Sequence, residues 1–597
     1  MKAAKPLVYS ALSVTLLGAL SAPAVAKPVY EIVNIDDYDL PTLLGTRTSY
    51  GKAGNTLGEV IGTSNGRRTT TDFDSDSGIS DSEVTYLNVT RPIVADLFTF
   101  TANETTNWQL QFDPIIDTTP PSEVDSPNTT DSVYFGSNDS GTKVGYASGP
   151  VSTLPIPPDE DADEDDPDTW YYREFEQRAF YKVGDQDPVF LPPSITSYEG
   201  YNIGGLSQAV SINESNVAVG YGSTELTAGG KSYIDNCIEN LEENPDTALP
   251  IDVCIQTGQF PVNGSIRIGY QTRAFKWQDN NGVVEPVQLE FPIDIDEDDT
   301  RLYLAQALGV NNNGVVVGRS HTYRDGDTSS LRYDAVWWTP DNKINQITFN
   351  NWDIFDSIAY DINDNGLMIG RSQRYISGYP RYKFFVLDTN EADPRIHEPL
   401  DFATTTTDLS SYPRSINNAG QVTGNIEVDY RKDTVRRRHA FLYDHRDESF
   451  EDVNNLLTCE SKGFEPDGDS WKRHEVTVTD GRGDTFTYQT IIEVVEGNKI
   501  LEDGTIIGTA FVSKPNYEVD EEGKVIIGDN GMPFFVLNAN GDPITTLIPR
   551  IAVLKPTSSG EVCTYEDDIS NPVYKRKGAA LWWLLLAAPL IWWRRRS

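Results

Sequence analysis

The chain has 597 residues, of which 38% are apolar and 11% aromatic, so it can build a sizeable folded core. Its formal net charge is −42; the segments 1–26 and 575–597 together hold eight basic residues and no acidic one, which leaves −50 for residues 27–574. Such an acidic body excludes nucleic acids and anionic membrane surfaces as partners.

Residues 1–26 match a secretory signal peptide. Lys2 and Lys5 precede an apolar run, and a small-residue cleavage site ends at Ala26, directly before Lys27. The apolar run is short for a permanent anchor, and the cleavage site disfavours one. We therefore expect cleavage between Ala26 and Lys27 and export of the mature chain.

A short pattern then recurs seven times, most clearly in AQALGVNNNGVVVGRS from Ala305 to Ser320. Each copy ends on a glycine: Gly62, Gly145, Gly220, Gly318, Gly370, Gly424 and Gly508. Seven residues earlier stand Asn55, Asn138, Asn213, Asn311, Asn363 and Asn417, with Leu501 in the last copy. Four residues before the closing glycine stand Gly58, Gly141, Gly314, Gly366, Gly420 and Gly504, with Asn216 in the third copy.

The pattern predicts a strand, a tight turn and a second strand. Glycine, and asparagine as second choice, enter left-handed backbone conformations at low cost, so Asn216 fits the turn. The apolar run after each turn indicates a buried strand. A third strand is predicted at Ala179–Tyr181, Ala274–Trp277, Ala335–Trp338, Phe384–Leu387, Ala440–Tyr443 and Phe534–Leu537, and a fourth in segments such as Asn345–Phe349.

The repeat spacing favours an all-β, seven-bladed β-propeller over residues 27–574. Gly318, Gly370 and Gly424 follow one another at 52 and 54 residues, close to the period of four-stranded propeller blades. Tyr30 to Asn34 is expected to close the ring by pairing with the last blade. The alternative is a row of unrelated hairpins in a β-sandwich.

Long insertions separate the repeats. One holds the acidic run Asp159 to Asp168, which reads as a solvated loop. The four cysteines of an exported chain indicate two disulfides, and the spacing favours Cys237 with Cys254 and Cys459 with Cys563 among three possible connectivities. A thiol nucleophile or a zinc site is disfavoured, because the chain has no CxxC and no histidine near a cysteine.

Candidate chemistry is sparse. Gly62 to Gly66 matches the GxSxG pattern around Ser64, but that pattern needs a turn from strand to helix, whereas here it follows a repeat strand. The five histidines form no HExxH, so a metal or base role is disfavoured: His321, His397, His439, His445 and His474.

Calcium is the one cofactor that a motif suggests. Asp361, Asn363 and Asn365 match the first half of an EF-hand loop, but Ser372 stands where a glutamate should complete the ligand shell. Aligned copies have Gly309 and Ser415 in place of Asp361 but retain the asparagine and the turn glycine, so the turn explains both. A second acidic run could also hold calcium loosely, although a solvated loop is the simpler interpretation: Asp294, Asp296, Asp298 and Asp299.

The segment 575–597 predicts a hydrophobic helix. Sixteen largely apolar residues from Gly578 to Trp593 stand between two basic clusters. Such a helix spans about 24 Å, against about 30 Å for a hydrocarbon core, and local thinning together with paired tryptophans at the interfaces makes a span tolerable. We expect a membrane anchor, at least a transient one.

Two resemblances extend this interpretation. The tail is similar to C-terminal sorting signals of the GlyGly-CTERM type, which implies cleavage by a rhomboid-like protease, although Gly578-Ala579 replaces the glycine pair. The repeats resemble the HAF-type extracellular repeat at Ile362–Gly370, Ile416–Gly424 and Ala274–Trp277. Together they resemble an exported gammaproteobacterial family of unknown function, which implies a propeller fold and no particular reaction.

Two functional classes remain. The first is a periplasmic, surface-anchored or secreted module that binds a protein or a glycan through its loops. The second is an extracellular propeller enzyme, a glycan hydrolase or lyase, with carboxylates near the central channel. The repeats carry no recurrent acid pair on the inner strands, so the binding module is favoured, with no catalytic residue assigned.

Overall fold

The structure is a computed structural model that describes residues 27–65, 89–123, 126–157, 167–259, 266–280, 283–296, 299–347, 354–402, 405–431, 435–520 and 525–563. The expected signal peptide and the expected anchor helix lie outside these residues, as does most of the acidic run that starts at Asp159.

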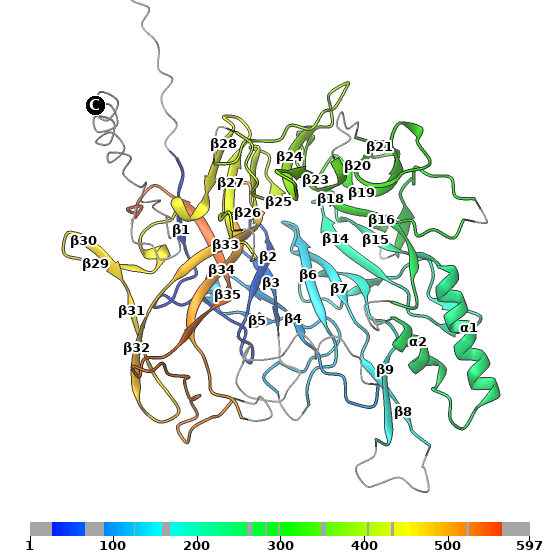
Figure 1. Cartoon of the computed structure of the whole chain (residues 1–597), viewed down its shortest axis with the longest axis horizontal. Coiled ribbons are helices and arrows are strands. Elements are labelled where there is room, and N and C mark those ends of the chain that lie inside the picture. Colours follow the sequence, from blue (N-terminus) through cyan, green and yellow to red (C-terminus); the bar gives the residue numbers. More distant parts are fainter. Residues whose placement is uncertain are drawn as a thin grey trace, which may run out of the picture.

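The described residues form a seven-bladed β-propeller, as the repeats predict (Figure 1). Each blade is an antiparallel sheet whose first strand is the innermost, and we number the blades along the chain. Blades 1 to 3 consist of β2 (Tyr50–Gly54), β3 (Val60–Asn65), β4 (Leu97–Ala102) and β5 (Gln111–Phe112); β6 (Ser132–Ser137), β7 (Thr142–Ala147), β10 (Arg178–Val183) and β11 (Val189–Leu191); and β14 (Ser207–Ile212), β15 (Val217–Leu226), β16 (Tyr270–Asn280) and β17 (Val283–Gln288). Blades 4 to 6 consist of β18 (Ala305–Val310), β19 (Val316–Tyr323), β20 (Leu331–Trp338) and β21 (Ile344–Gln346); β22 (Ile354–Ile362), β23 (Leu367–Ile376) and β24 (Tyr379–Asp388); and β25 (Ser411–Ile416), β26 (Gln421–Glu427), β27 (Arg438–Asp444) and β28 (Ser449–Asp452).

Blade 7 joins the two ends of the propeller. It consists of β33 (Ile492–Ile500), β34 (Ile506–Pro515), β35 (Thr545–Thr557) and β1 (Val29–Ile32). The N-terminal strand β1 pairs antiparallel with β35, with Tyr30 opposite Pro556. The innermost strands contact one another in order around the ring, and β33 lies against β2. The expected closure of the ring by Tyr30 to Asn34 is therefore confirmed for β1, which ends at Ile32.

Two strand predictions need correction. Phe534 to Leu537 is not the third strand of blade 7; it lies in an insertion between β34 and β35, where Phe535 forms only an isolated bridge with Tyr517. The longer apolar run in β35 takes that place and pairs along the whole of β34. In the described part of blade 5, a single bridge between Val386 and His397 stands where other blades have a fourth strand.

The core is divided among the blade interfaces. Within the described residues, seven clusters of buried apolar side chains each join two neighbouring blades, including the closing pair of blades 7 and 1. At the closing pair, Ile507 and Val553 of blade 7 pack with Phe98 and Phe100 of blade 1. Every blade therefore depends on both of its neighbours.

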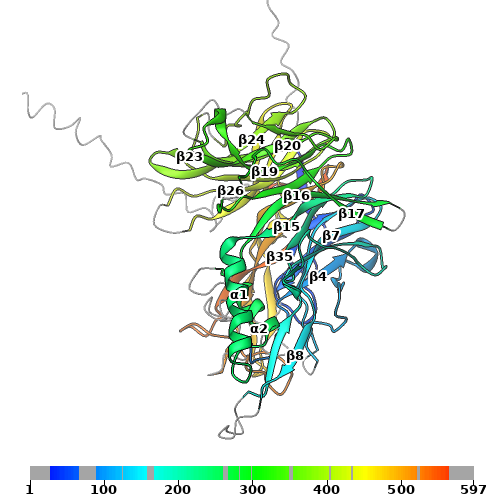
Figure 2. The same cartoon turned by 90° about the vertical axis from the view of Figure 1, so that its right-hand side faces the viewer.

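The insertions fold on the rim of the ring. Between β15 and β16, α1 (Ala228–Glu243) and α2 (Ile251–Gln259) pack together beside the hairpin of β8 (Val151–Pro155) and β9 (Thr169–Arg173), as Figure 2 shows. Thr227 caps α1, because its hydroxyl accepts the Gly230 N–H at 3.1 Å. The repeats predicted only strands here, so the two helices are an addition to the expected fold.

The remaining described insertions include short hairpins and 3₁₀ turns. The hairpins are β12 (Ser197–Tyr198) with β13 (Tyr201–Asn202), β29 (Phe464–Asp467) with β30 (Ser470–Arg473), and β31 (Glu475–Thr479) with β32 (Thr485–Gln489); the 3₁₀ turns are Glu104–Thr106, Arg324–Gly326, Val453–Asn455 and Glu460–Lys462. The last two hairpins precede blade 7 in the chain and form separate two-stranded sheets.

Candidate functional site

The repeat asparagines form a chain of hydrogen bonds from blade to blade. Each side-chain oxygen accepts the backbone N–H four residues later, as Asn311 does from Val315 at 2.9 Å, which holds the turn. Each side-chain nitrogen donates to the backbone carbonyl of the corresponding residue in the next blade. These inter-blade bonds are Asn55 to Asn138 (3.3 Å), Asn138 to Asn213 (2.9 Å), Asn213 to Asn311, Asn311 to Asn363, Asn363 to Asn417 and Asn417 to Leu501 (3.0 Å each). Leu501 has no side-chain amide, so this series of hydrogen bonds does not continue from Leu501 to blade 1.

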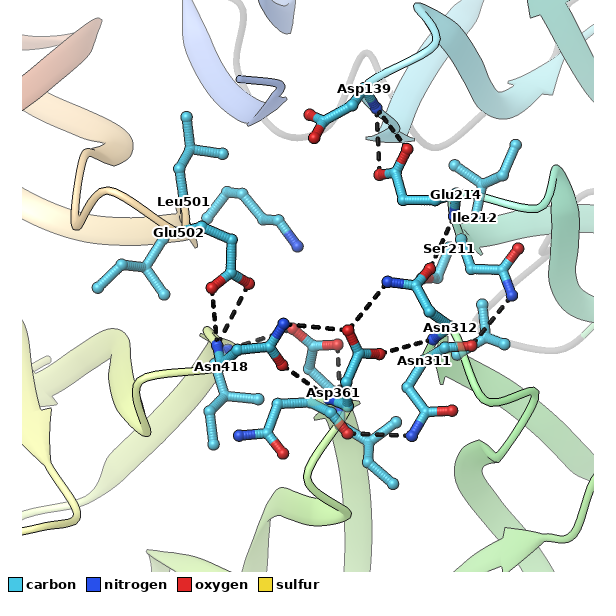
Figure 3. Close-up of a pocket in the computed structure, with 18 of the residues that line it drawn as sticks. Asp139, Ser211, Ile212, Glu214, Asn311, Asn312, Asp361, Asn418, Leu501 and Glu502 are labelled. Atoms are coloured by element: carbon cyan, nitrogen blue, oxygen red, sulfur yellow. Dashed lines mark hydrogen bonds between the residues drawn. The ribbon is translucent and has the colours of Figure 1, made fainter.

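A second chain of hydrogen bonds runs through the residue after each asparagine. Its backbone N–H donates to the side chain one position on in the ring: Thr56 to Asp139 (2.8 Å), Asp139 to Glu214 (3.1 Å), Glu214 to Asn312 (3.0 Å), Asn312 to Asp364 (2.8 Å), Asp364 to Asn418 (2.8 Å) and Asn418 to Glu502 (3.1 Å). Figure 3 shows Asp139, Glu214, Asn312, Asn418 and Glu502 around the pocket that these turns enclose.

This pocket, which we call the channel mouth, has a volume of about 130 Å³ and an acidic lining. Lys499 is the one basic residue among the lining residues, against the carboxylates of Asp139, Glu214, Asp361, Asp364 and Glu502. Burial raises the pKa of Glu214, and the charge of Lys499 offsets part of that shift. Burial would also raise the pKa of Asp364, but hydrogen bonds from Asn312 and Asn418 outweigh it and lower this pKa.

The carboxylates of the channel mouth are therefore structural acceptors. Four of them accept a backbone N–H of a neighbouring blade, and Asp361 accepts the N–H of Ile362 at 2.9 Å and of Ile416 at 3.2 Å. These hydrogen bonds hold the blades in register.

The residues of the calcium candidate take part in the same network. Asn363 accepts N–H groups of Asn365 and Leu367 and donates to Asn417, and Asn365 donates to the carbonyl of Asn418 at 2.9 Å. In the described part of the chain, no group of three or more His, Cys, Asp or Glu side chains is placed to hold a metal ion.

The closing glycine of every copy is required because a backbone carbonyl oxygen of the innermost strand lies close to its Cα atom. A Cβ atom on it would lie 1.8–2.3 Å from a backbone carbonyl oxygen of the innermost strand, for example 1.9 Å from that of Gln306 at Gly318. The turn position behaves as predicted: Gly314 has φ +81°, and Asn216 takes the same left-handed conformation at φ 57°.

Both expected disulfides are present. Cys237 of α1 is bonded to Cys254 of α2, and Cys459 is bonded to Cys563, and no described cysteine is free. The second bridge joins the segment before blade 7 to the residues that follow β35. The predicted pairing is confirmed.

The other sequence candidates are structural. Ser64 is fully buried, and its hydroxyl lies 2.5 Å from that of Thr46, which excludes an exposed nucleophile. Nδ1 of His321 accepts the Leu304 N–H at 2.9 Å, and burial, with Arg319 and Arg273 nearby, lowers its pKa to about 4. His439 lies between Asp452 and Glu493.

The three remaining histidines lie near the surface of the blades. His397 and His445 contact each other with ring centroids 6.4 Å apart, and Nδ1 of His474 lies 2.6 Å from the Glu465 carboxylate. None of these arrangements is that of a nucleophile with its base.

A larger cavity, which the sequence did not indicate, lies at the seam between blades 7 and 1. This seam cavity has a volume of about 730 Å³, within the range of small-molecule sites. It is lined by the segment after β1, the 3₁₀ turn of blade 1, the β31–β32 hairpin and blade 7: Val33, Asn34, Ile35, Asp36, Asp37, Asp39, Leu40, Pro41, Thr42, Glu104, Asn107, Trp108, Gln109, Val476, Val478, Tyr488, Lys514 and Arg550.

The seam cavity combines aromatic rings with charged groups. Trp108 and Tyr488 contribute rings, and Lys514 donates a hydrogen bond to Asp39. Burial lowers the pKa of Lys514, and Asp39 offsets only part of that shift. Burial raises the pKa of Tyr488, and the charge of Asp39 adds to the increase. Perturbed ionisable groups inside a cavity are typical of functional sites.

Strained backbone lies in the walls of the seam cavity and directly beside them. Two consecutive pairs of non-glycine residues have left-handed φ angles: Asp37 (43°) with Tyr38 (58°), and Asn107 (55°) with Trp108 (59°). Each such residue costs on the order of 1–3 kcal/mol and persists only when its surroundings hold it. Tyr38 is held by a hydrogen bond to the Phe464 carbonyl at 3.0 Å. Strain of this kind concentrates at ligand sites.

Some expectations fall outside the described residues. These are the cleavage after Ala26, the processing at Gly578-Ala579 and the anchor helix that ends at Trp593. Lys27, which would follow the cleavage, pairs with Glu451 at 2.6 Å. Within the residues that the structure describes, none of the helices is long and apolar enough to cross a membrane.

Residues 7–596 match the sequence profile of a family described as "Protein of unknown function (DUF3466)", so the chain belongs to this family. The search of curated proteins finds no match. Similar solved structures include a glycosyl hydrolase from Bacteroides ovatus (11% identity, TM-score 0.20, 63% of this chain and 95% of that one). Another is the Bombyx mori GH32 beta-fructofuranosidase BmSUC1 (8% identity, TM-score 0.22, 89% and 94%). TM-scores this low support no inference about function.

Proposed function

We propose that this member of the DUF3466 family is an exported binding protein that holds a glycan in its seam cavity. The observation that carries the proposal is the seam cavity itself, which is ligand-sized and lined by Trp108, Tyr488 and several amide and carboxylate side chains. An indole face packs well against the C–H face of a sugar ring, while amides and carboxylates bind its hydroxyls.

The proposed location of the protein is the periplasm or the cell surface. Two disulfides are typical of oxidising compartments, and the first 26 residues have the composition of a signal peptide. The tail would anchor the protein in the inner membrane, at least until a rhomboid-like protease cuts near Gly578-Ala579. HAF-type repeats in the propeller and a GlyGly-CTERM-like signal in the tail belong to the same proposal.

The alternative is a glycan hydrolase or lyase. The channel mouth argues against it, because its carboxylates accept backbone N–H groups of neighbouring blades. In the seam cavity, Asp39 accepts a hydrogen bond from Lys514 and Glu104 accepts one from Lys555, so two of the four lining carboxylates are paired with cations.

The test is a binding screen of the purified protein on a glycan array, followed by incubation of every bound glycan with the protein and analysis for cleavage. We expect binding without cleavage, and we expect Trp108→Ala to weaken it at least about fivefold, since ring stacking in a cavity contributes on the order of 1 kcal/mol or more. Tyr375→Ala removes an aromatic ring that is 57% exposed on blade 5 and serves as the control. Glycan cleavage, or equal binding by the Trp108→Ala variant, would contradict the proposal.

A further inference from the structure

The innermost strand of every blade contains a β-bulge at the same place. The register against the second strand shifts at the residue three positions before the motif asparagine, or before Leu501 in blade 7. A bulge leaves its extra residue unpaired and redirects the side chain. The seven bulge residues are Lys52, Phe135, Val210, Leu308, Tyr360, Arg414 and Asn498.

The bulge residues divide the ring into two halves. Blades 2, 3 and 4 contribute Phe135, Val210 and Leu308, apolar side chains that remain partly exposed on innermost strands. Blades 5, 6, 7 and 1 contribute a tyrosine, an arginine, an asparagine and a lysine. The ring therefore has an apolar side and a polar, cationic side.

Two cationic bulge residues lie on either side of blade 7. Lys52 belongs to blade 1 and Arg414 to blade 6, so the whole of blade 7 separates their strands. Burial lowers the pKa of Lys52, Glu496 of blade 7 opposes this shift, and Arg414 adds to it. Both residues are bulge residues of innermost strands, which surround the central axis of the ring. Arg414 is exposed although its strand is the innermost one, so solvent reaches it there.

Arginine and tyrosine side chains extend the cationic side into blades 5 and 6. The guanidinium of Arg371 lies 4.1 Å from the ring centre of Tyr382 and 4.9 Å from that of Tyr412, and the guanidinium of Arg414 lies 5.5 Å from the ring of Tyr360. Within the described structure, Nε of Arg371 is buried without a hydrogen-bond partner. An arginine in a chain of net charge −42 normally has many acidic neighbours.

A buried amide nearby also has no partner. Asn425 faces Tyr412 across the strand pair of blade 6 and is fully buried. Its side-chain oxygen and nitrogen both have no hydrogen-bond partner within the described structure. Buried polar groups are nearly always satisfied, so this amide calls for a water or a polar ligand beside it.

Two carboxylates face the same groups. Glu496 acts on Lys52, and Asp356 lies near Arg371, although burial raises the pKa of Asp356 and disfavours its charged form.

We propose that the central channel binds a small organic anion with an apolar body. Its carboxylate or phosphate faces Arg414, Lys52 and Arg371, and its apolar body faces Phe135, Val210 and Leu308. Guanidinium groups suit this role because they present several donors in a fixed plane to a carboxylate or a phosphate. The site is separate from the seam cavity and does not depend on the glycan proposal.

Calorimetric titration of the purified full-length protein with benzoate tests the proposal. Acetate lacks the apolar body, benzyl alcohol lacks the charge, and phenyl phosphate separates a preference for phosphate from one for carboxylate. We expect benzoate or phenyl phosphate to bind at least about tenfold more tightly than acetate and benzyl alcohol. Equal binding of all four probes, or of none, would overturn the proposal.

Three variants locate the binding site. Arg414→Gln should weaken binding of the preferred anion at least about tenfold, and Arg414→Lys, which retains the charge, should weaken it less. Arg446→Gln removes an exposed arginine that pairs with Asp444 at 2.5 Å and should leave binding unchanged. Trp108→Ala should also leave it unchanged, which separates this site from the seam cavity. Wild-type binding by an Arg414→Gln variant with an unchanged melting temperature would overturn the assignment.

Discussion

Asn363 shows why a turn residue of the motif is also an inter-blade residue. Its amide accepts two N–H groups of its own turn and donates to Asn417 of blade 6 at 3.0 Å, all in a buried position. Asn363→Leu leaves these groups unpaired, and each unsatisfied buried group costs about 1–3 kcal/mol. We expect denaturant unfolding to show a loss of about 3 kcal/mol or more. Asn365→Ala, in an exposed position of the same turn, should cost less than about 1 kcal/mol.

Gly318 tests the close approach at the end of the motif. Gly318→Ala places a Cβ atom 1.9 Å from the Gln306 carbonyl oxygen, so the innermost strand must move. Overpacking that forces the backbone to shift costs about 1–3 kcal/mol. Gly229→Ala, near the start of α1, meets nothing within 4 Å and should be neutral or slightly stabilising. Thermal melts of the two variants that coincide would contradict this explanation of the glycine.

His439 gives the fold a pH dependence. Burial alone would lower its pKa, but hydrogen bonds to Asp452 (2.6 Å) and Glu493 (2.7 Å) outweigh burial and raise the pKa to about 9, against an ordinary value of 6.5. The folded protein therefore holds this proton between pH 6.5 and 9 while the unfolded chain releases it. The stabilisation is fully present below pH 6.5 and is lost as the pH rises through 9.

The expected result is a free energy of unfolding that falls by on the order of 3 kcal/mol between pH 6.5 and 9. His439→Gln should be less stable than the wild type at pH 6.5 and should show a much smaller decrease over this interval. Parallel pH curves for the two proteins would show that the imidazolium does not contribute as described.

Repeated elements were predictable because their local requirements recur. A left-handed turn residue and an apolar strand are visible in each copy, and seven copies predict seven blades. The third strand of blade 7 was missed because Phe534 to Leu537 and β35 are both apolar runs, and only pairing with β34 decides between them. The repeats do not predict the helices α1 and α2, because the insertion that contains them lies outside the repeated pattern.

The candidate site was less predictable than the fold. The asparagines were visible, but the donation to the next blade depends on how neighbouring blades pack, which a turn signal does not contain. The seam cavity brings together residues near position 36, position 108 and position 488, which only ring closure places side by side. The cationic side of the channel depends in the same way on the bulges of β22, β25 and β2.

At the scale of the whole molecule, residues 575–597 are predicted to be a sorting signal that directs the protein to the membrane. A chain that ends at Tyr574 keeps all seven blades and both disulfides. Because residues 579–593 are apolar on every face, they suit a bilayer better than a soluble ring. We expect this truncated protein to match the melting temperature of the mature protein, and to be exported but not retained at the membrane. Cell fractionation and thermal denaturation measure the two outcomes, and a large loss of stability would instead make the tail structural.

The most direct measurement is a crystal structure of the protein with the glycan that binds best on the array. Our account predicts electron density for an intact sugar in the seam cavity, against the indole of Trp108 and between blades 7 and 1. Density for a cleaved sugar, or for a sugar at the channel mouth among Asp139, Glu214 and Glu502, would contradict it.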